Sequence, residues 1–428
     1  MYRNLVEATR LTRAGQVANA TALLLRTLRG RTTTVDVHNE PASNSSAETA
    51  SGSTDFAPPT VEAQELRPAP RIAPSFGRHT DEPTGRGATP RGLNSFLKRV
   101  VPPRPDMLRS GLVRPSPLER PRVPDGARFI ESVYSDGLGQ RDYKLYIPSG
   151  DQGQTRPLIV MLHGCTQTPD DFAAGTRMNE LAEEHNFLVV YPAQSISANS
   201  SKCWNWFNPR DQRRGQGEPA LIAGITRQVM RDYAVDERRV YVAGLSAGGA
   251  AAAIMSKAYP DLYAAVGVHS GLACGAASDL PSAFAAMRGG NNLSSWATPD
   301  ANTRIVPTIV FHGDQDATVS PCNGDQIIAQ SRGATATMEW TSVQNAQVPR
   351  GHAYSRMLYA NADGRSILEQ WIIRGAGHAW SGGSPAGSYT DPRGPDASRE
   401  MVRFFLEHSR PESDASLHFI RPPKALGL

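Results

Sequence analysis

The sequence predicts an α/β domain over residues 127–410, built on a mostly parallel sheet that helices cover on both faces. Continuous apolar runs such as Pro157–His163 are typical of strands that are buried on both faces. These runs alternate with helical segments, which is the order found in parallel sheets. One apolar run also leads through a glycine-flanked serine into an alanine-rich segment, which indicates a strand, a tight turn and a helix.

The expected elements follow one another along this domain. Two antiparallel strands around a turn at Asp136-Gly137 come first, and parallel strands then alternate with helices. We expect strands at 128–134, 143–148, 157–163, 187–191, 239–243, 264–268, 308–312 and 369–374, and helices at 170–185, 219–233, 247–258 and 398–408.

The residues before and after this domain differ from it in composition. Residues 1–30 have helical spacing with five arginines and one glutamate, which fits either a small helical appendage or an amphipathic anchor on an apolar or anionic surface. Residues 31–126 hold fifteen of the 33 prolines, so we expect a disordered linker. Residues 411–428 are expected to form a C-terminal tail.

Charge and hydropathy argue against several classes of protein. The 45 basic and 41 acidic residues nearly balance, which is untypical of a protein that mainly binds nucleic acid. No apolar stretch approaches the ~20 residues of a spanning helix, so we expect no transmembrane segment. The N-terminus shows no apolar region long enough for an export signal, which favours a cytoplasmic location.

The strongest chemical signal is Gly244-Leu245-Ser246-Ala247-Gly248, between an expected strand and an expected helix. In this setting the turn is so tight that the flanking glycines are needed to avoid collisions. The turn presents the serine hydroxyl above the sheet, with the N-terminus of the next helix directed at a developing oxyanion. The pattern therefore predicts that Ser246 is a nucleophile.

A nucleophilic serine needs a base and an acid that orients the base, in the chain order serine, acid, histidine. The expected strand 308–312 runs into His312-Gly313-Asp314-Gln315-Asp316, where we favour Asp316 as the acid and Asp314 as a turn residue. His378 follows the last expected strand in a loop of small residues and is the expected base. Ser246 would attack a carbonyl carbon, His378 would transfer the proton, and Asp316 would hold the imidazolium.

An oxyanion hole requires two backbone donors. We expect one at the amide of Ala247, directly after the nucleophile. The other is expected at the amide of Cys165, in the loop His163–Gln167, where Gly164 allows close approach of the backbone.

Aromatic residues and cysteines lie near these motifs. Trp204, Trp206 and Trp380 are expected to contact substrate, with ordinary core packing as the equal alternative. Cys165 and Cys203 belong to neighbouring motifs and are candidates for pairing, but the four cysteines allow three connectivities, and none need form in a reducing compartment. We expect no metal site, because no His-x-x-x-His or Cys-x-x-Cys pair occurs.

Five motifs in this order resemble the polyhydroxybutyrate depolymerase family of esterases. They are Leu162–Gln167, Cys203–Phe207, Gly244–Gly248, His312–Asp316 and Gly377–Trp380. The resemblance covers roughly 127–410 and implies an α/β-hydrolase fold, no cofactor, and hydrolysis of short-chain 3-hydroxyalkanoate polyesters or their oligomers. Because many members of the family are secreted, it also implies an extracellular location as the alternative to a cytoplasmic one.

Two alternatives remain open. The family is related to feruloyl and acetylxylan esterases, so a carboxylesterase for small esters is one of them. The other is a non-catalytic protein of storage granules that binds the polymer surface through residues 1–30. The complete set of Ser246, Asp316 and His378 argues against this second alternative, because a non-catalytic domain does not need all three.

Overall fold

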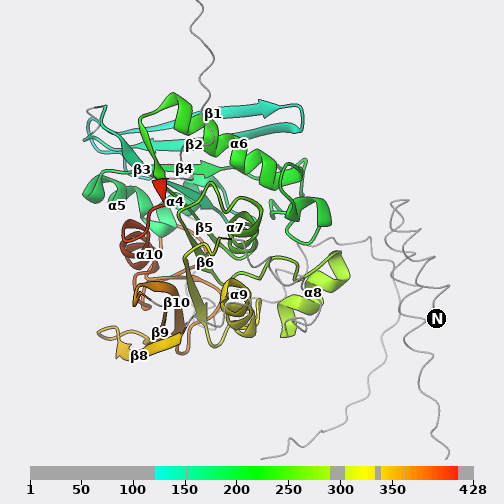
Figure 1. The fold of residues 1–428 in the computed structure, drawn as a ribbon, viewed down its shortest axis with the longest axis vertical. Helices are drawn as coiled ribbons and strands as arrows, with labels where there is room; N and C mark the ends of the chain where they lie inside the picture. The colour runs from blue at the N-terminus through cyan, green and yellow to red at the C-terminus, as the bar shows by residue number, and fades with distance from the viewer. Residues whose placement is uncertain (1–120, 151–152, 290–303, 333–338, 362, 413–428) are drawn as a thin grey trace, which may run out of the picture. The chain divides into compact units, whose positions relative to one another are not determined.

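The computed structural model describes residues 121–412, with gaps at 151–152, 290–303, 333–338 and 362 (Figure 1). The helical segment expected at 1–30 lies outside the described residues, as do nearly all of the linker 31–126 and of the tail 411–428. Within the described part, no helix is both long and apolar enough to span a bilayer.

One large sheet dominates the described residues. Its strands are β1 Arg128–Asp136, β2 Gly139–Ile147, β3 Arg156–Leu162, β4 Leu188–Pro192, β5 Val235–Leu245, β6 Ala265–His269, β7 Thr308–Gly313, β8 Glu339–Gln347, β9 Ala353–Ala360 and β10 Ser366–Ile373. Their spatial order is β1-β2-β4-β3-β5-β6-β7-β10-β9-β8. The central strands from β4 to β10 are parallel, whereas β1, β2, β8 and β9 pair antiparallel at the two edges. This arrangement confirms the expected mostly parallel sheet.

Helices cover both faces of the sheet (Figure 1). They are α4 Pro169–Thr176, α5 Met178–His185, α6 Gly217–Asp232, α7 Ala247–Ala258, α8 Leu280–Gly289, α9 Cys322–Arg332 and α10 Ala397–Leu406. Every residue of β3 is buried, and successive side chains point to opposite faces. Leu158 and Val160 accordingly pack in one core cluster with residues of α6 and α7, while Ile159 and Met161 pack in another with residues of α4, α5 and α10.

Two details of the N-terminal half differ from the expectation. The helix expected at 170–185 is two helices, because Arg177 adopts a left-handed conformation with φ of 54° between α4 and α5. The Arg177 guanidinium donates hydrogen bonds to the Gly382 carbonyl and to Asp396, both at 2.9 Å. The first hairpin turns at residues 137–138, and Asp136 Oδ1 accepts hydrogen bonds from the amides of Leu138 and Gly139.

Candidate active site

Ser246 lies in a strained turn between β5 and α7. Its φ of 57° and ψ of −119° are unusual for a residue with a side chain and are typical of a nucleophile at this kind of turn. A Cβ at Gly248 would overlap the carbonyl oxygens of Leu162 and His163, so no larger residue fits there. The amide of Ser246 donates a hydrogen bond of 2.9 Å to the His269 carbonyl, which fixes the turn to β6.

The structure brings Asp316 and His378 together. Nδ1 of His378 lies 2.7 Å from Oδ2 of Asp316, and the Asp316 side chain is completely buried. Oδ1 of the same carboxylate accepts hydrogen bonds from the amides of Thr318 and Val319, each at 2.9 Å. Both carboxylate oxygens are therefore held, and the carboxylate is aimed at the imidazole.

A second histidine contacts this carboxylate. Nε2 of His312 lies 3.4 Å from Oδ2 of Asp316 and 2.9 Å from the Val319 carbonyl oxygen. Burial by itself would raise the pKa of Asp316, but the hydrogen bonds from His312 and His378 outweigh burial and hold this pKa well below its usual range. Asp316 is therefore a carboxylate at neutral pH.

Asp314, the other acidic residue of this motif, has a different environment. Its Oδ1 accepts a hydrogen bond of 2.6 Å from the Gly375 amide, and its own amide donates to the Ile373 carbonyl. Asp314 thus joins the end of β7 to the start of the loop that carries His378, as a turn residue would.

The loop after β3 lies against the nucleophile. A Cβ placed on Gly164 would lie 3.7 Å from the Ser246 Cβ, an ordinary contact distance, so the loop lies directly beside the nucleophile. The Gly164 amide donates to Gln167 Oε1 at 2.8 Å, and the Thr166 amide donates to the Ser201 carbonyl at 2.7 Å. Cys165 and Ala247, the two expected oxyanion donors, both line the cavity that Ser246 lines.

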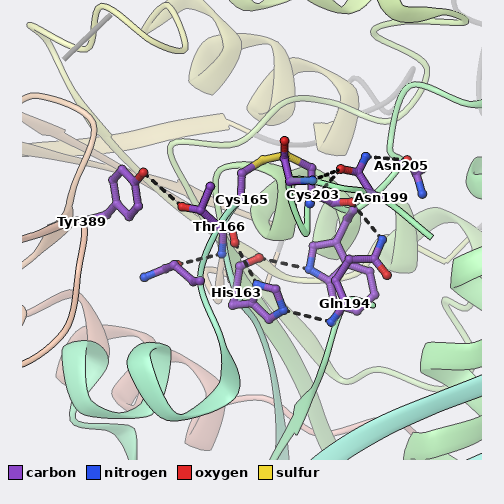
Figure 2. The surroundings of a disulfide bond; sticks show 12 residues. His163, Cys165, Thr166, Gln194, Asn199, Cys203, Asn205 and Tyr389 are labelled. Carbon is purple, nitrogen blue, oxygen red and sulfur yellow. Dashed lines mark hydrogen bonds between the residues drawn. A yellow bond between two sulfur atoms is a disulfide. The ribbon is translucent and has the colours of Figure 1, made fainter. Parts of the chain in front are cut away.

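The His163 side chain lies beside the same loop and holds it through hydrogen bonds (Figure 2). Its Nε2 accepts a hydrogen bond from the Gln194 amide at 3.0 Å, and Nδ1 lies 2.8 Å from the Gly164 carbonyl oxygen. Because a backbone amide can only donate, Nδ1 carries the proton and Nε2 does not. Burial is the main reason that the pKa of His163 falls to about 4.

A disulfide joins this loop to the segment that precedes α6. Cys165 and Cys203 form the bond, which Figure 2 shows beside His163, Thr166 and Asn199. Cys274 and Cys322 are free. The pairing that the sequence left open is therefore resolved, and both half-cystines line the cavity beside Ser246.

The three tryptophans have different roles. Trp206 lines the cavity beside Ser246. Trp204 is 1% exposed and donates from Nε1 to the His163 carbonyl, so it supports the loop from the core. Trp380 is also 1% exposed, packs edge-on against Phe172 and donates to the Ser398 hydroxyl. For Trp204 and Trp380 the burial favours the alternative of core packing over substrate contact.

Two adjoining cavities are lined by candidate catalytic residues. One, of about 310 Å³, is lined by Ser246 and mainly by apolar side chains. The other, of about 960 Å³, is lined by His378 and by more polar residues. Ala317 and Thr318 line both cavities, so the cavity lined by Ser246 and the cavity lined by His378 adjoin at these two residues.

Helix α8 was not predicted from the sequence, yet it forms much of the smaller cavity. Leu280, Ala283, Phe284, Met287 and Arg288 line it. These positions recur every three or four residues and therefore form one helical face. That spacing is the signal in the sequence that would have identified the helix.

Comparisons with known proteins show which family the chain resembles. The family model described as "Esterase PHB depolymerase" matches residues 141–352. A poly(3-hydroxyalkanoate) depolymerase C from Paucimonas lemoignei is 30% identical over 285 residues, which make up 64% of this chain and 67% of that protein. A poly(3-hydroxybutyrate) depolymerase from Ralstonia pickettii is 28% identical over 54% of this chain and 49% of that protein.

Relatives with other printed activities also match. A feruloyl esterase B from Neurospora crassa is 28% identical over 58% of this chain and 87% of that protein. A solved acetyl xylan esterase from Aspergillus awamori has a TM-score of 0.49 at 19% identity, over 65% of this chain and 99% of that chain. The family match and the identity to the Paucimonas protein show that the chain belongs to the PHB depolymerase family of esterases, which are carboxylic-ester hydrolases.

Proposed function

We propose that the chain is a serine esterase in which Ser246 is the nucleophile, His378 the general base and Asp316 the orienting acid. The observation that carries this proposal is the 2.7 Å contact between His378 and a buried Asp316 carboxylate. The cavity that His378 lines adjoins the cavity lined by Ser246, which lies in a strained turn after β5. A carboxylate only accepts hydrogen bonds, so Nδ1 of His378 carries the proton and Nε2 is free to act as a base.

The reaction follows in two stages. Nε2 of His378 takes the proton of the Ser246 hydroxyl while Oγ attacks the ester carbonyl carbon. The amides of Ala247 and Cys165 and the N-terminus of α7 stabilise the oxyanion. The alcohol leaves with the proton from His378, and a water molecule activated by the same imidazole then hydrolyses the acyl-enzyme.

Replacing the nucleophile tests this mechanism. Purified Ser246→Ala protein should keep its fold by circular dichroism and lose hydrolysis of p-nitrophenyl butyrate, falling by about 10⁴-fold or more. Ser256→Ala is a suitable control, because Ser256 lies in α7 and donates its hydroxyl hydrogen bond within that helix, to Ala253. Retained activity in the Ser246→Ala protein would remove this residue from the mechanism.

For the substrate, we propose esters of short-chain 3-hydroxyalkanoates, as polyester or oligomers. The depolymerase names of two relatives support this class. The size and apolar lining of the cavity beside Ser246 also suit a short acyl group. We assign this cavity to the acyl group, because the leaving alcohol must lie on the side of His378 to receive its proton.

Feruloyl or acetylxylan esters are the second candidate, favoured by the relative that is named a feruloyl esterase. Release of 3-hydroxybutyrate from amorphous polymer and from a soluble dimer should be compared with release of ferulate from methyl ferulate. We expect kcat/KM to be highest for the hydroxybutyrate substrates. A higher value for ferulate would replace the proposed substrate without affecting the serine mechanism.

Granule binding through residues 1–30 and a cytoplasmic location remain predictions. Deletion of residues 1–30 should reduce cosedimentation with polymer granules, and unchanged binding would reject the anchor. The Cys165–Cys203 disulfide bears on the location, because disulfides persist in oxidising compartments. Thiol labelling of the protein in freshly lysed cells would show whether these two cysteines are reduced where the protein accumulates.

A further inference from the structure

We propose that the side chain of His269 is a positioning residue for ester hydrolysis, because it ties the segment after His378 to the strands that carry Ser246 and Asp316. This inference rests on the proposed function, since it assumes that these three residues act together. His269 is completely buried, so its imidazole acts on the reaction only through its neighbours.

The position of His269 in the sheet places it between the nucleophile and the acid. It is the last residue of β6 and lies opposite Leu245 of β5 and Phe311 of β7. Its carbonyl oxygen accepts the hydrogen bond from the Ser246 amide. Any residue at this position would supply that backbone carbonyl, so this hydrogen bond does not explain a role for the imidazole side chain.

The imidazole makes one hydrogen bond that no apolar ring can replace. Its Nε2 lies 3.0 Å from the amide nitrogen of Ser381, three residues after His378, and accepts that proton. Nδ1 therefore carries the ring proton and is 3.1 Å from the Ser270 hydroxyl oxygen. Loss of the acceptor would leave the Ser381 amide buried without a hydrogen-bond partner, which destabilises this arrangement of the segment.

The faces of the same ring join the acid and base segments. The ring stacks on Trp380 at a centroid distance of 5.1 Å and on Phe311 at 5.8 Å. Phe311 precedes the Asp316 motif along β7, and Trp380 follows His378 by two residues. The imidazole thus contacts both segments whose relative placement sets the 2.7 Å distance between His378 and Asp316.

Neighbouring backbone bonds keep the segment folded when the imidazole is changed. The amides of Trp380 and Gly382 bond to the carbonyls of Tyr389 and Asp391, in the short pair β11 (Trp380–Ser381) and β12 (Thr390–Asp391). Removal of the acceptor should therefore shift the segment rather than unfold it. A shift of about 1 Å in catalytic geometry can lower a rate by about 100-fold.

The test compares two substitutions at this position. His269→Phe keeps an aromatic ring for stacking but removes the acceptor, whereas His269→Gln can offer an amide oxygen to Ser381. With p-nitrophenyl butyrate we expect His269→Phe to lower kcat by about 10- to 100-fold with KM changed less than about threefold. We expect His269→Gln to recover most of kcat, because it restores the hydrogen bond.

His408→Phe is the matched control. This histidine is also buried, in the turn that follows α10, where its ring nitrogens lie near the carbonyl oxygens of Phe404 and Ser366. The control should lower the melting temperature while leaving kcat per folded molecule unchanged. If His269→Phe does not fold, Ser270→Ala replaces it, and we expect a smaller loss of kcat because the ring loses its second partner.

Two results would overturn the proposal. One is an unchanged kcat in His269→Phe or, if that variant does not fold, in Ser270→Ala. The other is a loss in His269→Gln as large as that in His269→Phe, which would show that restoring the acceptor for the Ser381 amide does not restore kcat. Either result leaves the serine mechanism standing as long as Ser246→Ala is inactive, so the two proposals fail separately.

Discussion

Nδ1 of His378 lies 2.7 Å from Oδ2 of Asp316, whereas Asp314, two residues earlier, accepts its hydrogen bond from the Gly375 amide. Two acidic residues of one turn thus have separate tasks. Asp316 faces the imidazole, and Asp314 joins two loops. This difference can be tested with the same substitution at both positions.

Asp316→Asn should lower kcat by about 10³- to 10⁴-fold, because an amide at this position favours the wrong tautomer of His378. Asp314→Asn should change kcat by less than about fivefold, since its amide oxygen can still accept from Gly375. Steady-state kinetics with p-nitrophenyl butyrate measures both. A larger loss for Asp314→Asn than for Asp316→Asn would reverse the assignment.

The Cys165–Cys203 disulfide closes a loop with a sequence separation of 38 residues beside the cavity. By loop-closure entropy, we expect the double variant Cys165→Ser/Cys203→Ser to lose about 2–4 kcal/mol of unfolding free energy. Its kcat should fall but not vanish, because the Thr166 amide and Trp204 still hold the loop. Urea unfolding and ester hydrolysis measure the two effects.

Treatment with dithiothreitol distinguishes the effect of losing the disulfide from the effect of the two serine side chains introduced in the double variant. The reductant should destabilise the wild-type protein and leave the double variant unchanged. Cys322→Ser, which alters a free cysteine, should behave like wild type. Equal sensitivity of wild type and double variant to dithiothreitol would contradict a role of this bond in stability.

Local patterns in the sequence were sufficient to predict the central sheet and the nucleophile turn. Helix α7 has the predicted bounds Ala247–Ala258, because the serine motif marks its start and the alanine-rich run its length. Strands β3, β4 and β6 consist mainly of apolar residues and were recognisable without knowledge of their neighbours. Asp316 and His378 were selected by chain order, and the structure brings these two together.

Features that depend on tertiary contacts were not predictable in this way. The break at Arg177 relies on partners more than 200 residues away, Gly382 and Asp396. The burial of Trp380 follows from stacking on His269 and from the Ser398 hydroxyl. Helix α9 and the edge strands β8 and β9 carry weak periodicity, so they were not predicted either.

Filling the smaller cavity should change the acyl-chain preference. Ala283 is 2% exposed and lines this cavity from α8, so Ala283→Leu would reduce the space for the acyl group. We expect kcat/KM for p-nitrophenyl hexanoate to fall by about 10- to 100-fold relative to the acetate.

Ala285→Leu makes the same change on the exposed side of α8 and should leave the ratio unaltered. The ratio of kcat/KM for the hexanoate to kcat/KM for the acetate is measured for wild type and both variants. Because both values come from the same sample, differences in the folded fraction cancel. An unchanged ratio in Ala283→Leu would place the acyl group in the other cavity.

The buried imidazole of His163 should make stability depend on pH. Its pKa is about 4 in the folded chain, mainly because of burial, against an ordinary value of 6.5. Between these values the unfolded chain binds a proton that the folded chain does not, so the free energy of unfolding falls as the pH drops from about 6.5 towards 4. The contribution is at most about 1.4 kcal/mol per pH unit.

Glu218 acts in the opposite direction, since burial raises its pKa to about 6 from 4.5 and its folded form binds the proton first. The dependence of wild-type stability on pH therefore combines both groups with other buried histidines of lowered pKa, such as His269, and the comparison with His163→Gln isolates His163. Urea unfolding at pH 7.5, 6.5, 5.5 and 4.5 should give a shallower loss of stability for His163→Gln than for wild type. Parallel curves for the two proteins would mean that His163 is protonated to the same extent in the folded and unfolded chains.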